Sequence, residues 1–315
     1  MRALRHSPKF LLRKNFFYAG NIIGNAQKGE KMMYFFMDNS EFTYKWLRVL
    51  FRTDYLVLGG YLASLDDMKI MEDEINKIKE NCEIPIDLPI KWNLKDDRIR
   101  KIYEKHEKLD VYKKLLSSAD EIRLSIISVL NKTKCKLIMS AEPVYKGKLR
   151  EQVYIWIFEN ILQRLGQALE NEMQSQSNYY PSISIVMDWP GGDHRPYFQT
   201  YSKAYHFKQP GFFCGDLKAL NMNVNFAVST TNNSPHLQAA DIFVGITKDF
   251  LEWVYKERDV ERVKKFFPPL EPFFRKSKAG KIMGYGLIVG KKQEYEKVEK
   301  KIEEIKQIAE NEIPF

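Results

Sequence analysis

Acidic side chains directly follow three apolar stretches of the chain. Asp38 follows YFFM, Asp188 follows ISIVM, and Glu142 follows LIMSA. Short apolar runs bounded by polar residues predict buried strands, so each acid is expected at the carboxyl end of a strand. In open α/β sheets the ligand crevice lies outside such strand ends. One Asp in this position is commonly a turn residue, but three acids at such ends favour a shared carboxylate site.

A further acid, Asp241, lies inside a predicted helix that covers residues 234–257. Ser234 is a favourable N-cap and Pro235 a favourable first helical residue. The apolar stripe of this helix includes Leu237 and Val244, which places Asp241 on or beside the buried face. A buried acid is costly unless it pairs with a buried Lys or Arg or binds a metal. The residues alone leave both interpretations open.

Carboxylates that gather at one place repel one another unless a cation neutralises them. Oxygen ligands with coordinated waters suit Mg²⁺ or Mn²⁺, and such a site can activate water against a phosphodiester. We therefore predict that Asp38, Asp188 and Asp241 are metal ligands, and that Glu142 is a fourth candidate for the catalytic set.

Polar residues close to these acids in sequence are candidate substrate contacts. They are Ser40, Lys91, Ser234, His236 and Gln238. Lys91 could bind a phosphate and Trp92 could stack on a base, although a core position is the favoured interpretation for Trp92. His236 lies in the first turn of the helix that carries Asp241. It could shuttle a proton or bind metal, but an isolated His at a helix start is more often a capping-region residue.

The hydrophobic patterns predict an α/β fold with a mixed sheet and helices on both faces, because several central strands are apolar throughout. Predicted strands cover residues 31–38, 54–64, 121–131, 134–145, 182–188 and 221–230. Predicted helices cover residues 64–82, 96–118, 148–173, 234–257 and 291–312. Residues 88–93 form a short extended piece. Residues 265–290 are expected to be an irregular loop that leads to a late strand or hairpin.

Five pieces of this sequence occur in an order that resembles a family called domain of unknown function 3800. The pieces are YFFMDNSEF, YLVLGGYLAS, IKWN, SISIVMD and SPHLQAADIFVG, which together span roughly residues 32–260. The resemblance implies a ribonuclease H-like fold with an acidic site. It matches Asp38 to the first Asp of the family and Asp241 to the Asp of its Gln-x-x-Asp motif, and it places Asp188 at an expected strand end.

The sequence departs from the family pattern at two positions. Asn39 stands where the family has Glu, and Pro89 stands where an acid is frequent. Glu41 could replace the missing acid only if the chain bends after Asp38, because strand alternation puts residues 39 and 41 on the opposite face. These departures motivate an alternative function, a non-catalytic module that binds nucleic acid or protein on the same fold.

The net charge of +9 favours an anionic partner, and we expect nucleic acid, with the choice between DNA and RNA left open. The isolated cysteines Cys82, Cys135 and Cys214 lack zinc-binding spacing and fit a reducing compartment, so a cytoplasmic location is expected. Since no apolar run reaches about 18 residues, no membrane span is expected.

Three regions are predicted along the chain. Residues 1–31 are a basic N-terminal arm or an upstream extension, residues 32–260 are the ribonuclease H-like domain, and residues 261–315 hold a loop or hairpin and a C-terminal helix. The apolar residues of that helix form a narrow seam at spacings of three and four. The seam could mediate a homodimer, or a scaffold role, or it could pack on its own domain.

Overall fold

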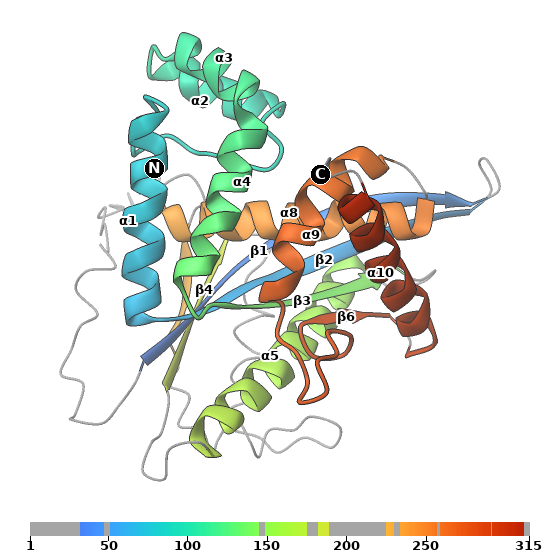
Figure 1. Ribbon diagram of the computed structural model, residues 1–315. Helices are drawn as coiled ribbons and strands as arrows, with labels where there is room; N and C mark the ends of the chain where they lie inside the picture. Colours follow the sequence, from blue (N-terminus) through green and yellow to red (C-terminus); the bar gives the residue numbers. More distant parts are fainter. Residues whose placement is uncertain are drawn as a thin grey trace, which may run out of the picture.

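A six-stranded mixed β-sheet forms the centre of the molecule (Figure 1). The computed structural model describes residues 32–46, 51–144, 149–174, 182–188, 225–229, 234–256, 259–290 and 292–311. The strands are β1 (Met32–Trp46), β2 (Phe51–Ser64), β3 (Lys136–Pro143), β4 (Ser182–Asp188), β5 (Asn225–Ser229) and β6 (Leu287–Val289). Their order is β5-β4-β1-β2-β3-β6, and β2 is antiparallel to both of its neighbours while the other pairs are parallel. The predicted α/β class with a mixed sheet is confirmed.

Helices cover both faces of this sheet (Figure 1). The α-helices are α1 (Leu65–Asn81), α2 (Asp97–Lys105), α3 (Leu109–Ser117), α4 (Ala119–Val129), α5 (Arg150–Gln174), α8 (Pro235–Lys256), α9 (Val260–Leu270) and α10 (Tyr295–Asn311). Short 3₁₀ turns are η3 (Leu130–Lys132), η5 (Glu271–Phe273) and η6 (Lys292–Glu294). Helix α5 packs on one face against β2 and β3, and α8 packs on the other face against β1 and β2.

The two faces have separate apolar cores, which identify the direction of each strand residue. Phe36 and Phe42 of β1 belong to the core under α8, whereas Phe35 and Met37 belong to the core under α5. Alternate residues of a strand point to opposite faces. Asp38, between Phe36 and Phe42 in this alternation, therefore points to the α8 side.

Strand β1 does not end at Asp38, which corrects the prediction. It continues to Trp46 because β2 pairs with it along its whole length, from Met33 opposite Ser64 to Trp46 opposite Phe51. Phe42 and Tyr55 stack across this ribbon with ring centroids 5.0 Å apart. Beyond the last residue of β1 that pairs with β4, β1 continues in a ribbon with β2, its remaining partner. The polar residues after Asp38 are compatible with a strand in this ribbon.

Two other predicted elements are also corrected. Residues 121–131 were expected to form a strand, but they lie in α4 and η3, where Ile122, Ile126 and Val129 follow helical spacing and are buried. Residues 96–118 form two helices instead of one, since Glu107 adopts a left-handed conformation with φ of 58° between α2 and α3. A left-handed residue interrupts the hydrogen-bond ladder of a helix.

The segment after residue 260 packs into the same core as the sheet. Helix α9 includes part of the segment expected to be irregular, and β6 is the late strand that follows. Val298, Ile302 and Ile305 of α10 are buried in the core under α8. The chain itself therefore buries these three residues of the seam that was considered for dimerisation. The predicted arm, residues 1–31, lies outside the described residues.

Within the described part of the chain, no helix combines the length and apolar character needed to cross a bilayer.

Candidate active site

Parallel pairing of β1 with β4 brings two of the predicted acids together. Met37 lies opposite Met187 in the register, so Asp38 and Asp188 occupy the next position on neighbouring strands. Both methionines point into the core under α5. Asp38 and Asp188 therefore point to the α8 side, where strand β4 ends and β1 continues. Asp188 is at a strand end as predicted, and Asp38 is beside that end, within its own strand.

Asp38 is a buried carboxyl group with one unsatisfied oxygen. Its side chain is 3% exposed, and Oδ1 accepts a hydrogen bond of 2.6 Å from the backbone N–H of Asn39. Oδ2 has no hydrogen-bond partner among the described residues. Burial raises the pKa of Asp38 well above its ordinary value, and the charges of Asp241 and Asp188 raise this pKa further. The group is therefore poised to hold a proton or to bind a cation.

Helix α8 supplies the third acid, Asp241, to the same place. Burial raises the pKa of Asp241, whereas the charge of Lys91, the N–H of Trp92 and a hydrogen bond with Asp38 lower it. The pKa of each carboxyl group is therefore raised chiefly by burial, and the two groups interact directly. Two adjacent carboxyl groups cannot both ionise at low cost without a nearby cation.

Lys91 provides positive charge beside the carboxyl groups. Its Nζ lies 3.9 Å from Oδ2 of Asp188, and its charge lowers the pKa of both Asp38 and Asp241. The side chain of Lys91 is about one-quarter exposed, so it reaches the site from the solvent side. Asp38, Asp188, Asp241 and Lys91 together form what we call the carboxylate cluster.

Gln238 and Asp241 hold the segment that carries Lys91. Oε1 of Gln238 accepts a hydrogen bond of 3.2 Å from Ile90 N–H, and Oδ2 of Asp241 accepts one of 2.5 Å from Trp92 N–H. In an extended segment, alternate N–H groups point the same way, and residues three apart on a helix lie on one face. Gln238 and Asp241 therefore lie on the same face of α8. From there they can accept hydrogen bonds from two N–H groups, two residues apart, that point the same way from the extended segment.

Trp92 fixes the far end of this segment in the core, as the favoured interpretation predicted. Its ring packs against Gly245, where an added Cβ would lie 2.2 Å from the ring carbon Cγ. The guanidinium carbons of Arg123 and Arg262 lie 4.6 and 4.2 Å from the ring centroid, and Nε1 donates to Asp249 at 3.1 Å. A base therefore cannot stack on Trp92 in this arrangement.

Buried Lys79 fixes the near end of the segment. Its Nζ donates to the carbonyl oxygens of Ile86 and Leu88 at 2.9 and 2.8 Å, and burial lowers the pKa of Lys79 to about 8. Sequence reasoning did not identify Lys79. The available signal was its position in α1, where it follows Met71 and Ile75 at steps of four residues along the buried face.

Glu142 does not join the carboxylate cluster. Asp38 lies opposite Gly59 of β2, which in turn lies opposite Met139 of β3. Glu142 is three residues farther along β3 than Met139. Because alternate residues of a strand point to opposite faces, Glu142 points away from the face that carries Asp38. Burial and the charge of Glu294 raise the pKa of Glu142 to about 7. The prediction erred because a carboxyl-terminal position on a strand does not specify the face to which the side chain points.

His236 also lies away from the carboxylate cluster, in the apolar core beneath α8. Its ring stacks on Phe36 with centroids 4.4 Å apart. Nδ1 lies 3.0 Å from the hydroxyl of Tyr61, and Nε2 lies 3.8 Å from a carboxylate oxygen of Glu72. His236 is therefore held as a structural residue and has no described contact with the three Asp side chains.

The remaining predicted contacts have local roles. Oγ of Ser234 accepts a hydrogen bond of 3.3 Å from Leu237 N–H and thus caps α8. Ser40 is on the same face of β1 as Asp38, one alternation farther along. Asn39 points to the other face, where the Tyr154 hydroxyl donates to its Oδ1 at 3.4 Å. Glu41 pairs with Arg150 and does not replace the missing acid.

The donor atoms of the carboxylate cluster fit a hard divalent cation by their chemistry, and the orphaned Oδ2 of Asp38 is an available ligand. In their described positions, however, no three His, Cys, Asp or Glu side chains form a group that could hold a metal ion. The carboxylate cluster therefore suits a divalent cation by the type of its donor atoms and by its unbalanced negative charge. The carboxyl groups would have to turn toward the ion in order to bind it.

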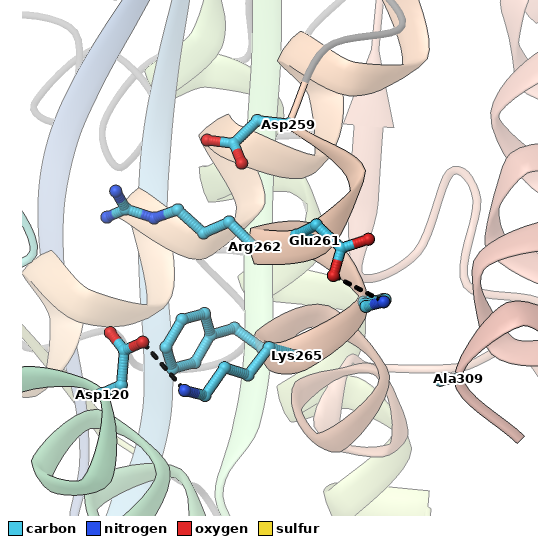
Figure 2. A pocket seen from close by; sticks show the side chains of 8 residues that line it. Asp120, Asp259, Glu261, Arg262, Lys265 and Ala309 are labelled. Carbon is cyan, nitrogen blue, oxygen red and sulfur yellow. Dashed lines mark hydrogen bonds and ion pairs between the residues drawn. The ribbon is translucent and has the colours of Figure 1, made fainter. Parts of the chain in front are cut away.

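A surface cavity of about 560 Å³ lies elsewhere, beside α4, α9 and α10 (Figure 2). Its charged residues are largely paired with one another. Lys265 contacts Asp120 at 2.9 Å, and Lys264 contacts Glu261 at 2.6 Å. Because these charges already neutralise one another, the cavity is a weaker candidate for a functional site than the carboxylate cluster.

Comparisons of this chain with models of known protein families, with curated proteins and with solved structures find no match.

Proposed function

We propose that this protein is a ribonuclease H-like enzyme that cleaves or transfers phosphodiester bonds of nucleic acid with the help of a divalent metal ion. The observation that carries the proposal is the convergence of Asp38, Asp188 and Asp241, from β1, β4 and α8, with an unsatisfied oxygen on Asp38. A buried carboxyl group whose pKa is raised by burial and by neighbouring acids is typical of a functional site.

The arrangement of the strands supports the ribonuclease H-like part of the proposal. Without β6 the order reads β3-β2-β1-β4-β5, with β2 reversed. This is the order expected for a ribonuclease H-like sheet. The resemblance to the family called domain of unknown function 3800 agrees with it, since the same acids occupy the first strand, a later strand and the late Gln-x-x-Asp helix.

Asp38, Asp188 and Asp241 would hold Mg²⁺ or Mn²⁺. Such an ion, when bound, lowers the pKa of water and polarises a phosphoryl oxygen. Asp38 would release its proton when the ion binds, because the positive charge removes the repulsion that keeps the carboxyl group protonated. Lys91 would place its ammonium group against a phosphate oxygen, and Gln238 would hold the backbone that carries Lys91. The net charge of +9 favours the approach of a nucleic acid.

The test measures metal binding and cleavage on one set of proteins. Wild type is titrated with Mn²⁺ by calorimetry and incubated with single- and double-stranded DNA and RNA. Asp38→Asn and Asp241→Asn are compared with Asp73→Asn, a control on the exposed face of α1. We expect Mn²⁺-dependent cleavage by wild type and Asp73→Asn, and at least about a hundredfold loss in both cluster variants. Absence of cleavage by wild type, together with equal Mn²⁺ binding by Asp38→Asn, would refute the proposal.

A non-catalytic nucleic-acid-binding module is the second candidate. It is favoured by Lys91, whose ammonium group already compensates part of the negative charge that a metal would neutralise. The replacement Lys91→Met separates the candidates. In a metal enzyme this variant should bind Mn²⁺ at least as tightly as wild type while losing turnover. In a binding module no Mn²⁺ heat should appear, and only nucleic-acid affinity should fall.

A further inference from the structure

Lys91 belongs to a segment, residues 86–94, that forms neither helix nor strand and is nevertheless largely buried. The side chain of Lys91 is about one-quarter exposed, and the buried residues around it are Leu88, Pro89, Ile90, Trp92 and Leu94. Buried backbone N–H and C=O groups need hydrogen-bond partners, and an irregular segment has no helical or sheet ladder to supply them. The partners must therefore come from side chains of other elements.

Two tyrosines from α2 and α3, which lie beside α1 and α4 in Figure 1, supply such partners. The hydroxyl of Tyr103 donates to the carbonyl oxygen of Pro89 at 3.0 Å, and the hydroxyl of Tyr112 donates to that of Leu94 at 2.7 Å. Both side chains are buried, and their ring centroids lie 5.4 Å apart. These two helices therefore hold the segment on both sides of Lys91.

Helix α4 holds the residue directly after Lys91. Nη2 of Arg123, a residue that is 7% exposed, donates to the carbonyl oxygen of Trp92 at 2.6 Å. Asp241 of α8 accepts a hydrogen bond from the N–H of the same residue. The hydrogen bonds from α1 and α8 described above hold the residues shortly before Lys91 in the same way. Side chains from five helices thus converge on the backbone that carries Lys91.

The place to which this backbone delivers Lys91 favours a role beyond filling the core. Lys91 is the one charged residue between residues 88 and 92, and its Nζ lies 3.9 Å from Oδ2 of Asp188. A lysine side chain is flexible, so a fixed backbone is needed to restrict where its ammonium group can lie. A cation that is fixed before the substrate arrives stabilises negative charge without a cost of reorganisation.

We propose that Tyr103, Tyr112 and Arg123 are positioning residues, which hold the backbone on both sides of Lys91 so that its ammonium group meets a phosphate group of the substrate at the carboxylate cluster. The inference rests on the proposed function for the identity of the substrate, whereas the positioning of Lys91 can be tested without it. It gives α2, α3 and α4, which contribute no member of the carboxylate cluster, a role in the site.

The first experiment measures how firmly Lys91 is held, without metal or nucleic acid. The full-length protein is acylated with trace amounts of acetic anhydride, and peptide mass spectrometry compares the rate at Lys91 with that at exposed Lys69. Tyr103→Phe and Tyr112→Phe each remove one hydroxyl group and keep the ring. We expect the relative rate at Lys91 to rise about threefold or more in both variants, since losing one hydrogen bond shifts a local opening equilibrium by such a factor.

Tyr61→Phe is the matched control. It removes a hydroxyl that is as buried as that of Tyr103 but lies 3.0 Å from Nδ1 of His236, away from the segment. All three variants should lose a similar amount of Tm, but Tyr61→Phe should leave the rate at Lys91 at the wild-type value. Rates at Lys91 that do not rise in the two segment variants, or that rise equally in Tyr61→Phe, would overturn the proposal.

The second experiment connects the position of Lys91 with the substrate. Affinity for single-stranded DNA and RNA oligonucleotides is measured in EDTA for Tyr112→Phe, Lys91→Met and the double variant. Tyr112→Phe should weaken binding about threefold on its own and have no further effect in the Lys91→Met background, although it lowers the Tm in both.

Two results of this second experiment contradict the positioning role. They are an affinity that Tyr112→Phe leaves unchanged, and a loss of affinity that persists in the Lys91→Met background. A third result separates this inference from the proposed function. If wild type binds no nucleic acid while the acylation rates change as expected, the proposed function fails and the positioning of Lys91 stands.

Discussion

Asp38 gives the metal-free protein a specific dependence on pH. Its pKa is raised in the folded protein by burial and by Asp241 and Asp188, while Lys91 and the N–H of Asn39 act in the opposite direction. A raised carboxyl pKa stabilises the fold below the ordinary value of 3.8, and this stabilisation is lost as pH rises through the folded pKa. Asp38→Asn should therefore have a larger free energy of unfolding than wild type at pH 7.

Chemical denaturation of wild type and Asp38→Asn between pH 4 and pH 8, without divalent ions, measures this difference. The two proteins should converge at the acid end and separate as pH rises. A difference in unfolding free energy that stays constant from pH 4 to pH 8 would mean that Asp38 is ionised over this whole range. Excess Mn²⁺ should then stabilise wild type and have little effect on the variant.

Glu142 should produce a second pH effect, in a different range. Burial and Glu294 raise its pKa from 4.5 to about 7, so its contribution to stability is complete below 4.5 and lost as pH rises to about 7. Glu142→Gln should flatten the decline of Tm between these values. Glu310→Gln, an exposed acid in the last turn of α10, should leave the slope unchanged. Equal slopes in all three proteins would show that Glu142 is not perturbed.

The residues of the carboxylate cluster were predictable to different degrees. Asp188 and Asp241 could be placed from apolar runs and from helical spacing, because each lies within an element whose buried face the sequence reveals. The proximity of Lys91 could not be predicted in this way. Lys91 belongs to an extended segment whose position depends on hydrogen bonds to α8, formed by residues about 150 positions away.

Helix α8 and the segment that ends at Trp92 depend on Gly245 for their close approach. The ring cannot move away, because Asp249 holds its Nε1 and the guanidinium groups of Arg123 and Arg262 lie against it. Gly245→Ala would place a methyl group 2.2 Å from Cγ of the ring. We expect a loss of about 2 kcal/mol of stability, since overpacking outweighs the gain of about 1 kcal/mol in helix propensity.

A double-mutant cycle with Trp92→Ala checks the cause of that loss. In the Trp92→Ala background the added methyl group has space, so Gly245→Ala should become neutral or stabilising. A cost that is unchanged in this background would place the strain elsewhere in α8.

The lengths of the elements were harder to predict than their existence. The run that ends at Met37 correctly indicated a strand, but polar residues 38–41 concealed its continuation, which depends on pairing with β2. Residues 121–131 have apolar residues at spacings compatible with both periods, and burial against α1 and α9 decides in favour of a helix. Local sequence cannot decide between a helix and a strand in a segment where such tertiary contacts dominate.

The described residues of the second and third predicted regions, 32–260 and 261–315, share an apolar core, which makes the C-terminal helix a structural element. Removal of α10 by truncation after residue 290 would expose the surface that Val298, Ile302 and Ile305 cover. Each buried apolar side chain contributes roughly 1.5–3 kcal/mol. We expect the truncated protein to have a much lower Tm. Light scattering should show no change from dimer to monomer, and such a change without loss of stability would contradict this role.

The carboxylate cluster is assembled from residues 38, 91, 188 and 241, and this separation along the chain has a consequence during synthesis. Strand β1 leaves the ribosome early, but α8, which covers the face of β1 that carries Asp38 and which brings Asp241, follows about 200 residues later. Contacts between such distant segments form late in folding. A nascent chain therefore cannot present a complete set of acids to nucleic acid, including the messenger from which it is being translated, until α8 has docked on the sheet.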